Sequence, residues 1–283
     1  MAQPLKHKKD TIMSPSNDTN QHAFDAYGAI ARVYDRLNAE INYSAWADFV
    51  EACFVRYLKE KPELLLDLAC GTGSMTLELL RRGYDMIGVD ASPDMLSVAW
   101  ERADEQALEG ALFLLQDMRS FELYGTVGAV TCCLDSINYL LTAEDVRTTF
   151  ATVHNYLDPD GLFLFDVNSP YKFKHVYGDN AYILEDELIA EDGNAQAIYC
   201  GWQNHFDEET GLCTFDLSLF EEREDGGYDR SDEQQTECCY TEEQLETLLK
   251  ETGFEILGCF GGWDFSEPKQ DCERYYFVAR AKK

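Results

Sequence analysis

The pattern of hydrophobic positions first indicates a strand, a glycine turn and a helix. The apolar run that begins at Leu64 ends in Asp67, and the chain then breaks into Gly71-Thr72-Gly73. The next stretch, SMTLELLRRG, places leucines at helical spacing and ends at Gly83. The same alternation recurs, and further strands are predicted at 85–90, 111–117, 128–135 and 161–168.

Helix start signals stand between these strands. Ser92 precedes one helical stretch, and Thr142 stands three residues before Asp145 at the start of another. Thr241 and Gln244 form a capping box for a later helix. The strands themselves are nearly continuous apolar runs, which is typical of a parallel sheet buried on both faces. Strands alternating with helices predict a doubly wound, Rossmann-like α/β fold.

The pattern changes after residue 168. Segments near 182–190, 195–206, 211–222 and 227–240 are rich in aromatic and aliphatic residues, and the stretches between them have hairpin-turn chemistry. We therefore predict an antiparallel β insertion. This insertion, residues 169–240, holds 18 acidic and 4 basic side chains. After it come one helix and a closing strand pair, FEILGCFGGW and ERYYFVARA.

Charge and cysteine content limit the partners and the compartment. The chain has 53 acidic and 23 basic residues, a formal net charge of −30, which disfavours binding to a phosphate backbone. None of the ten cysteines is spaced as C-x-x-C, so we expect reduced thiols, no metal site and a cytoplasmic protein. No apolar run is long enough to span a membrane, and no membrane partner is expected.

The glycine turn indicates a nucleotide-like cofactor, because a turn that enters a helix offers free N–H groups. Asp90 ends the second strand, 17 residues past Gly73, where a carboxylate can bind both hydroxyls of a ribose. The third glycine of the dinucleotide pattern is replaced by Thr76, and Asp67 beside the turn would repel a pyrophosphate. Asp67 suits an ammonium group instead. Asp117, with Met118, can meet an adenine at the third strand end.

These motifs have a family resemblance. LLDLACGTG, GVDAS and LLQDMRSF resemble the successive motifs of class I S-adenosylmethionine-dependent methyltransferases. Across residues 24–282, with YDRLNAEINYSAW and CCLDSINYL as further matches, the chain is similar to the branch of sugar-amine N,N-dimethyltransferases and related bacterial small-molecule methyltransferases. The resemblance implies a seven-stranded sheet with one reversed strand. It also implies methyl transfer from S-adenosylmethionine, leaving S-adenosylhomocysteine.

The resemblance also divides the chain. Residues 1–23 fall outside it and have no apolar core of a signal peptide, so we expect a disordered leader. Residues 24–168 and 241–283 would form the cofactor-binding domain with an N-terminal helical cap, and residues 169–240 would form a β lid over the cofactor. The implied cofactor-binding residues are Tyr34, Tyr43, Trp46, Asp67, Ala69, Gly71, Gly73, Asp90, Ala91, Met95, Gln116, Asp117, Met118 and Leu134.

Catalysis of methyl transfer rests mostly on positioning, because the donor carbon is already activated. An amine acceptor needs only its neutral form, whereas a hydroxyl needs a general base. The candidates near the acceptor are Asp135 and Asn138 from the fourth strand end and Tyr34 from the cap, while His175 and His205 are possible bases in the insertion. Residues 135–138, DSIN, lack the Asn/Asp-Pro-Pro-aromatic pattern of nucleobase methyltransferases, which favours a small-molecule acceptor.

Two other functions fit the same pattern. An NAD-dependent oxidoreductase would share the glycine turn and the ribose acid. A non-catalytic S-adenosylmethionine-binding protein would share the whole site, because a fold carries no function by itself. The sequence leaves the choice between nitrogen and oxygen acceptors open, and also that between monomer and homodimer.

Overall fold

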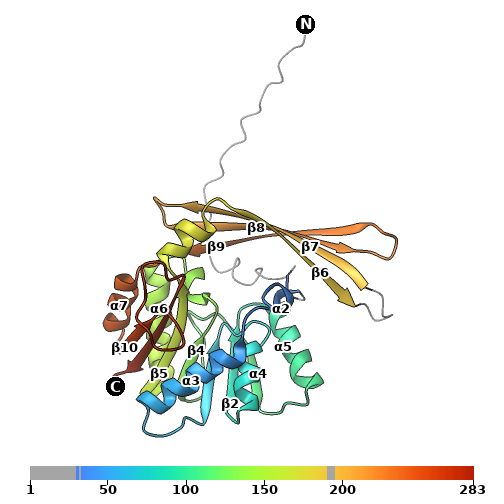
Figure 1. Cartoon of the computed structure of the whole chain (residues 1–283). Coiled ribbons are helices and arrows are strands. Elements are labelled where there is room, and N and C mark those ends of the chain that lie inside the picture. Colours follow the sequence, from blue (N-terminus) through green and yellow to red (C-terminus); the bar gives the residue numbers. More distant parts are fainter. Residues whose placement is uncertain (1–29, 32, 190–194) are drawn as a thin grey trace.

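The computed structural model describes residues 30–31, 33–189 and 195–283, and Figure 1 shows their arrangement. The predicted leader, residues 1–23, and the predicted hairpin turn at 192–194 lie outside the described residues. The predicted methyltransferase domain and the predicted insertion are both visible, as a seven-stranded sheet with helices and a separate four-stranded sheet.

The larger sheet has the strand order β10-β11-β5-β4-β1-β2-β3. β11 runs antiparallel to both of its neighbours, and the other described pairs in this sheet are parallel. This confirms the predicted seven-stranded α/β sheet with one reversed strand. Its strands are β1 (Leu64–Leu68), β2 (Asp85–Asp90), β3 (Ala111–Leu115), β4 (Val127–Cys132), β5 (Leu157–Asn168), β10 (Phe254–Phe260) and β11 (Arg274–Ala281).

Helices cover both faces of this sheet, as its apolar strands require. Leu66 of β1 lies in one buried cluster with side chains of α6 and α7, whereas the adjacent Leu65 lies in another with side chains of α3 and α4. The helices are α2 (Tyr34–Leu37), α3 (Tyr43–Tyr57), α4 (Ser74–Arg81), α5 (Pro93–Glu105), α6 (Ala143–Tyr156) and α7 (Glu242–Glu251), with short helical turns η1 (Ser136–Tyr139) and η2 (Lys172–Tyr177).

The predicted helix caps are present. The Ser92 hydroxyl accepts the Met95 N–H at 3.3 Å, and Thr142 accepts the Asp145 N–H at 3.1 Å. The capping box of Thr241 is complete, with both of its hydrogen bonds formed. These local signals therefore set the starts of α5, α6 and α7 correctly.

The second sheet, here called the inserted sheet, has the antiparallel order β6-β7-β8-β9 and confirms the predicted β insertion. Its strands are β6 (Ala181–Ile189), β7 (Ala195–Asp207), β8 (Leu212–Glu222) and β9 (Tyr228–Cys238). It lies across the end of the domain where β5 finishes and extends beyond that domain on one side (Figure 1). η2, which the sequence did not predict, connects β5 to β6 and buries Phe173.

Further features limit the kinds of site. All ten cysteines lie in the described part of the chain and none forms a disulfide. Among the described residues, no group of three or more His, Cys, Asp or Glu side chains is placed to hold a metal ion. No helix in the same part of the chain is long and apolar enough to cross a membrane.

Close packing between β2 and β3 yields a stability prediction. A Cβ on Gly88 would lie 2.6 Å from the Phe113 ring and 2.9 Å from the Cys70 sulfur. Gly88→Ala should therefore lower the free energy of unfolding by about 1–3 kcal/mol through overpacking. Urea denaturation measures this change. Gly125→Ala is the matched control, because a Cβ there meets no atom within 4 Å. Equal stability of the two variants would contradict the prediction.

Candidate functional site

Asp67 lies beneath the glycine turn rather than on its surface. Its side chain is buried, and its two oxygens accept the hydroxyls of Thr76 at 2.6 Å and Thr131 at 2.9 Å. Burial raises the pKa of Asp67 to about 6, although these hydrogen bonds favour the charged form. Asp67 thus ties α4 and β4 to β1. The expected electrostatic attraction for a bound ammonium group would act from below the turn.

The glycine turn and the end of β2 hold each other in place. Ala69, Gly71 and Gly73 all have positive φ, between 54° and 77°, which explains the two glycines. The Asp90 carboxylate accepts the N–H groups of Gly71 and Ser92, each at 2.8 Å. Burial raises the pKa of Asp90. A Cβ on Gly71 would meet no atom within 4 Å, so the space directly beside Gly71 is open.

An acid that the sequence did not single out, Asp35 of α2, occupies the start of α4. Its carboxylate accepts the hydroxyls of Thr72 at 2.8 Å and Ser74 at 2.9 Å. It also pairs with Arg102 of α5 at 2.8 Å. A helix start that follows a glycine turn is where a dinucleotide places its pyrophosphate. Because Asp35 already supplies the negative charge there, the turn does not suit a pyrophosphate.

The predicted adenine end is closed by internal contacts. Asp117 forms a two-point ion pair with Arg119, with Nε–Oδ1 at 2.9 Å and Nη2–Oδ2 at 2.5 Å. Burial alone would raise the pKa of Asp117, but the bonds from Arg119 hold it below its ordinary value. The Gln116 side chain binds the backbone of Glu122 and so shapes the following loop. Met95 is buried at the start of α5, and Met118 is half-buried.

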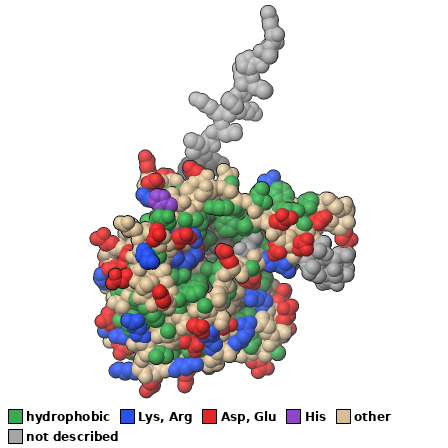
Figure 2. Space-filling model, in the orientation of Figure 1, with side chains coloured by type: hydrophobic (Ala, Val, Ile, Leu, Met, Phe, Trp, Pro, Cys, Tyr) green, Lys and Arg blue, Asp and Glu red, His purple; other side chains and the backbone are tan. Residues whose placement is uncertain are grey.

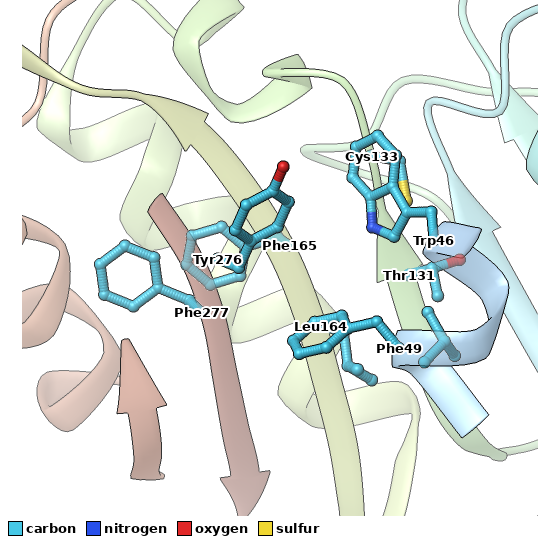
Figure 3. Close-up of a pocket in the computed structure, with 9 residues that line it drawn as sticks. Trp46, Phe49, Thr131, Cys133, Leu164, Phe165, Tyr276 and Phe277 are labelled. Carbon is cyan, nitrogen blue, oxygen red and sulfur yellow. The ribbon is translucent and has the colours of Figure 1, made fainter. Parts of the chain in front are cut away.

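The three aromatic residues of the predicted cap lie in different surroundings. Trp46 is a core residue, 5% exposed, with its ring centroid 5.7 Å from that of Trp263 and 5.8 Å from that of Tyr276. Figure 3 shows it beside a cavity of about 10 Å³, room for about one water molecule and for no cofactor. Tyr43 lies at the start of α3 beside Ser74, and burial raises its pKa.

Tyr34 is the cap residue closest to the predicted reaction centre. Burial raises its pKa, and the carboxylates of Asp135, Asp35 and Asp90 raise it further. The negative charges of these acids therefore favour the neutral phenol. Its ring also packs against the buried cluster of the inserted sheet. Tyr34 thus lies where cap, cofactor domain and inserted sheet meet.

The chain after β4 adopts an unusual turn. Leu134 and Asp135 both have left-handed backbones, with φ of 58° and 51°, a conformation that is costly for leucine. The Asp166 carboxylate of β5 accepts both of their N–H groups, at 2.8 and 3.0 Å. Arg274 of β11 pairs with Asp166 and, at 2.9 Å, with Asp135. Although burial opposes ionisation, Arg274 and Lys172 hold the pKa of Asp135 below its ordinary value.

A buried polar network joins this turn to the inserted sheet. The Asn168 amide N–H groups donate to Asp135 at 2.8 Å, to Glu237 of β9 at 2.9 Å and to the Tyr177 hydroxyl at 3.2 Å. Lys172 donates to the Asn168 oxygen at 3.0 Å. Glu237 is buried, and burial together with the charge of Asp135 raises its pKa well above the ordinary value. Burial and the nearby charge therefore favour the neutral form of this carboxyl group.

The remaining catalytic candidates have other partners. The Asn138 amide donates to the Cys238 carbonyl at 2.8 Å and accepts the Asn168 N–H at 2.9 Å, so it fastens β9 to the end of β5. His175 and His205 are exposed, and His205 binds Asp179 at 2.8 Å. Asn138 thus has a backbone-fastening position, whereas Asp135 pairs with Arg274 and accepts from Asn168.

Comparisons with known proteins agree with this geometry. A family model described as "Methyltransferase domain" matches residues 65–161. A Bacillus subtilis (strain 168) protein named "Putative methyltransferase YqeM" is 35% identical over 258 residues, 91% of this chain and 98% of the relative. The crystal structure of an S-adenosylmethionine-dependent methyltransferase from Clostridium acetobutylicum ATCC 824 is 30% identical, with a TM-score of 0.79, and covers 92% of this chain and 100% of that chain.

Two more distant relatives are named as N-methyltransferases. The glycine/sarcosine N-methyltransferase of Aphanothece halophytica is 28% identical over 255 residues, 85% of this chain and 84% of the relative. The dTDP-3-amino-3,4,6-trideoxy-alpha-D-glucopyranose N,N-dimethyltransferase of Streptomyces venezuelae is 30% identical over 169 residues, 59% of this chain and 67% of the relative. The chain therefore belongs to the class I methyltransferases, enzymes that use S-adenosylmethionine as the methyl donor.

Proposed function

We propose that this enzyme methylates the nitrogen of a small polar amine held between Tyr34, Asp135 and the inserted sheet, which acts as a lid. The observation that carries this proposal is the protonation pattern around Asp135. Arg274 and Lys172 lower the pKa of Asp135 and so favour its ionised form, whereas burial raises the pKa of Glu237, Tyr34 and Tyr177 and so favours their neutral forms. This arrangement suits a neutral amine that becomes a cation on methylation.

The cofactor half of the site binds and orients. S-adenosylmethionine supplies a methyl group on a positively charged sulfur. In our proposal Asp90 accepts the ribose hydroxyls, the turn from Ala69 to Gly73 lies along the methionine half, and Ala91, Met95 and Met118 pack on the adenine. Asp117 accepts from the adenine amino group through the lone pairs that Arg119 leaves available. Leu134 faces the sulfur, and Asp67 contributes charge from beneath.

A nitrogen acceptor fits this acceptor half better than an oxygen acceptor. A hydroxyl must lose its proton to a base with a pKa near neutrality. Asp135 is a weak base because its pKa is lowered. Burial raises the pKa of Glu237, but its Oε2 already accepts a hydrogen bond from the Asn168 amide. Burial lowers the pKa of Lys172, but its ammonium group already donates to Asn168. A neutral amine needs no base, and the Asp135 carboxylate stabilises the positive charge that forms on its nitrogen.

The names of the distant relatives support the same acceptor class. One acts on glycine and sarcosine, and another acts on the amino group of a nucleotide sugar, so both are named for transfer to nitrogen. The two acceptors have little else in common. We infer that the amine is the feature that the acceptors share. The lid then determines which amine-bearing molecule the enzyme accepts.

Electrostatics disfavours a nucleic acid acceptor. The chain has 53 acidic and 23 basic residues, and the lid has the largest excess of acidic over basic residues for its length. Figure 2 shows carboxylates spread over the drawn face, with hydrophobic side chains gathered where the lid meets the larger domain. Phosphate backbones bind through neutralisation by Lys and Arg. The surface therefore favours a neutral or cationic small molecule.

The function is tested directly with methyl-labelled S-adenosylmethionine. Incubation with a host metabolite extract should place label on a small amine, identified by chromatography and mass spectrometry. Purified tRNA and duplex DNA at physiological salt should receive none. Label on either polymer, or on an oxygen atom of the small product, would contradict the proposal.

Because Asp90 is proposed to accept the ribose hydroxyls, a variant that removes its charge should bind the cofactor more weakly. Asp90→Asn should lose about 1.5–3 kcal/mol of charge-assisted hydrogen bonding, or about 10- to 150-fold in the Kd of S-adenosylhomocysteine. Isothermal titration calorimetry measures this. Asp94→Asn, an exposed acid in the first turn of α5, is the control and should bind as the wild type does. Unchanged affinity in Asp90→Asn would place the ribose elsewhere.

The protonated state of Glu237 predicts a pH dependence. A carboxyl group whose pKa rises on folding stabilises the fold below its unfolded pKa, and this contribution is lost as pH rises through the folded pKa. Relative to Glu237→Gln, the wild type should lose up to about 1.4 kcal/mol per pH unit above the ordinary range of glutamate. Urea denaturation between pH 5 and 8 tests this. The exposed Glu224→Gln should run parallel to the wild type, and parallel behaviour of Glu237→Gln would refute the assignment.

A further inference from the structure

The lid carries buried polar groups that lack partners on the face turned toward the larger domain. Alternation along β8 places Phe215 and Leu217 on this inner face, where they join the buried cluster that includes Ile30 and Val33. Pairing places Asn204 of β7 opposite Phe215 and Trp202 opposite Leu217. An otherwise apolar face therefore presents an amide and an indole N–H.

Neither of these groups is satisfied by any residue that the structure describes. Asn204 is 2% exposed, and both its Nδ2 and its Oδ1 lack a hydrogen-bond partner. The Trp202 Nε1 is also buried without a partner. The Asn204 backbone is properly bonded, since its N–H donates to the Asn180 carbonyl at 2.8 Å. Buried polar groups are rarely left unpaired in native proteins, so these two indicate a ligand that completes them.

The two groups share the inner face with side chains of β8 and β9, and this largely buried set is here called the patch. Trp202 and Asn204 are two residues apart on β7, which places them about 7 Å apart along the strand. Across the sheet, β7 and β9 are separated by two strand spacings, about 10 Å. On the far side of the patch, β9 places Gln235 opposite Phe215 and Glu233 opposite Leu217. Gln235 donates to Glu233 at 2.6 Å, so that side presents oxygen atoms. The patch thus has nitrogen donors at one edge, carbonyl and carboxylate oxygens at the other, and an apolar floor.

The patch adjoins the reaction centre. The Gln235 oxygen accepts the Tyr139 hydroxyl at 2.9 Å, and Tyr139 belongs to η1, which directly follows Asp135. The Phe215 ring lies 5.0 Å from that of Tyr177, whose hydroxyl accepts from Asn168, the residue that also donates to Asp135. A molecule lying along the patch would therefore reach from Asn204 to the neighbourhood of Asp135.

We propose that Asn204 and Trp202 form a subsite that binds hydroxyl groups of the acceptor, an inference that rests on the proposed function and specifies its substrate. Two N–H donors require an oxygen atom of the ligand, and the Asn204 oxygen requires a donor. A hydroxyl supplies both. A carboxylate supplies no donor and would also meet the acidic lid. The acceptor is thus an amine on a hydroxylated carbon skeleton, and Asn204 determines specificity.

The subsite has two opposite consequences for stability and activity. Without its ligand, the Asn204 amide is a buried polar group that destabilises the fold. Asn204→Leu removes that cost and should raise the Tm by about 2–4 °C. The same variant cannot bind the hydroxyl group and should lower methyl transfer to the labelled small amine by about 10-fold or more. Its affinity for S-adenosylhomocysteine should not change.

The experiment compares the wild type with three variants by thermal unfolding, calorimetry with S-adenosylhomocysteine, and label transfer to a metabolite extract. Gln203→Leu is the matched control, because Gln203 is the adjacent amide on β7 but is exposed on the outer face. It should match the wild type in cofactor affinity and transfer. Trp202→Phe, which removes the N–H and keeps an aromatic ring, is a second test and should also slow transfer if Asn204→Leu fails to fold.

The outcomes separate this inference from the function on which it rests. If the wild type labels no small molecule, the proposed function fails and the subsite falls with it. If the wild type is active and Asn204→Leu or Trp202→Phe transfers label at the wild-type rate, only the subsite is wrong. A lower Tm for Asn204→Leu would show that ordered water satisfies the amide and would also overturn it. A labelled product that contains no hydroxyl group, as tested by acetylation, would also overturn the subsite.

Discussion

The site depends on one strained turn and the carboxylate that holds it. Leu134 and Asp135 are both left-handed, and Asp166 accepts both of their N–H groups while Arg274 binds Asp166 and Asp135 together. Such a conformation persists only where the surroundings over-determine it. It turns the Asp135 carboxylate toward Asn168 and so toward the lid. Loss of Arg274 would leave two buried carboxylates without their cation, and the turn and the junction with the lid would both be affected.

Acidic residues have different surroundings on the surface and in the interior of the protein. On the surface the excess of carboxylates is solvated, whereas each buried acid of the site has a defined partner: Asp67 has two threonine hydroxyls, Asp166 has Arg274, and Glu237 has Asn168. Burial favours the neutral form of an acid, and ion pairs favour the charged form. Arg274 therefore favours the charged form of Asp135, whereas burial and the charge of Asp135 favour the neutral form of Glu237.

Local signals in the sequence predicted the fold, and distant partners decided the site. The caps at Ser92 and Thr241 were predictable because donor and acceptor are three residues apart. Asp35 and Arg102 are separated by 67 residues, and Asp166 and Arg274 by 108, so no local pattern indicated either pair. The sequence contains one sign of the role of Asp166, which is a charged residue within the apolar run of the predicted strand 161–168. Trp46 matched the family motif, but its neighbours in the core come from β11 and the loop before it.

The same long-range pairing explains how the proposed lid could carry specificity at the expense of stability. β7 and β8 could bury an unbroken apolar face against the larger domain, as Phe215 and Leu217 do. The unpaired amide of Asn204 interrupts that face and weakens the free enzyme. A site made of buried donors rejects molecules that leave those donors unpaired, and an apolar pocket cannot discriminate in this way. Because the proposed chemistry at nitrogen needs no base, we infer that the lid selects the acceptor, and an energetic cost in the lid is the expected sign of that selection.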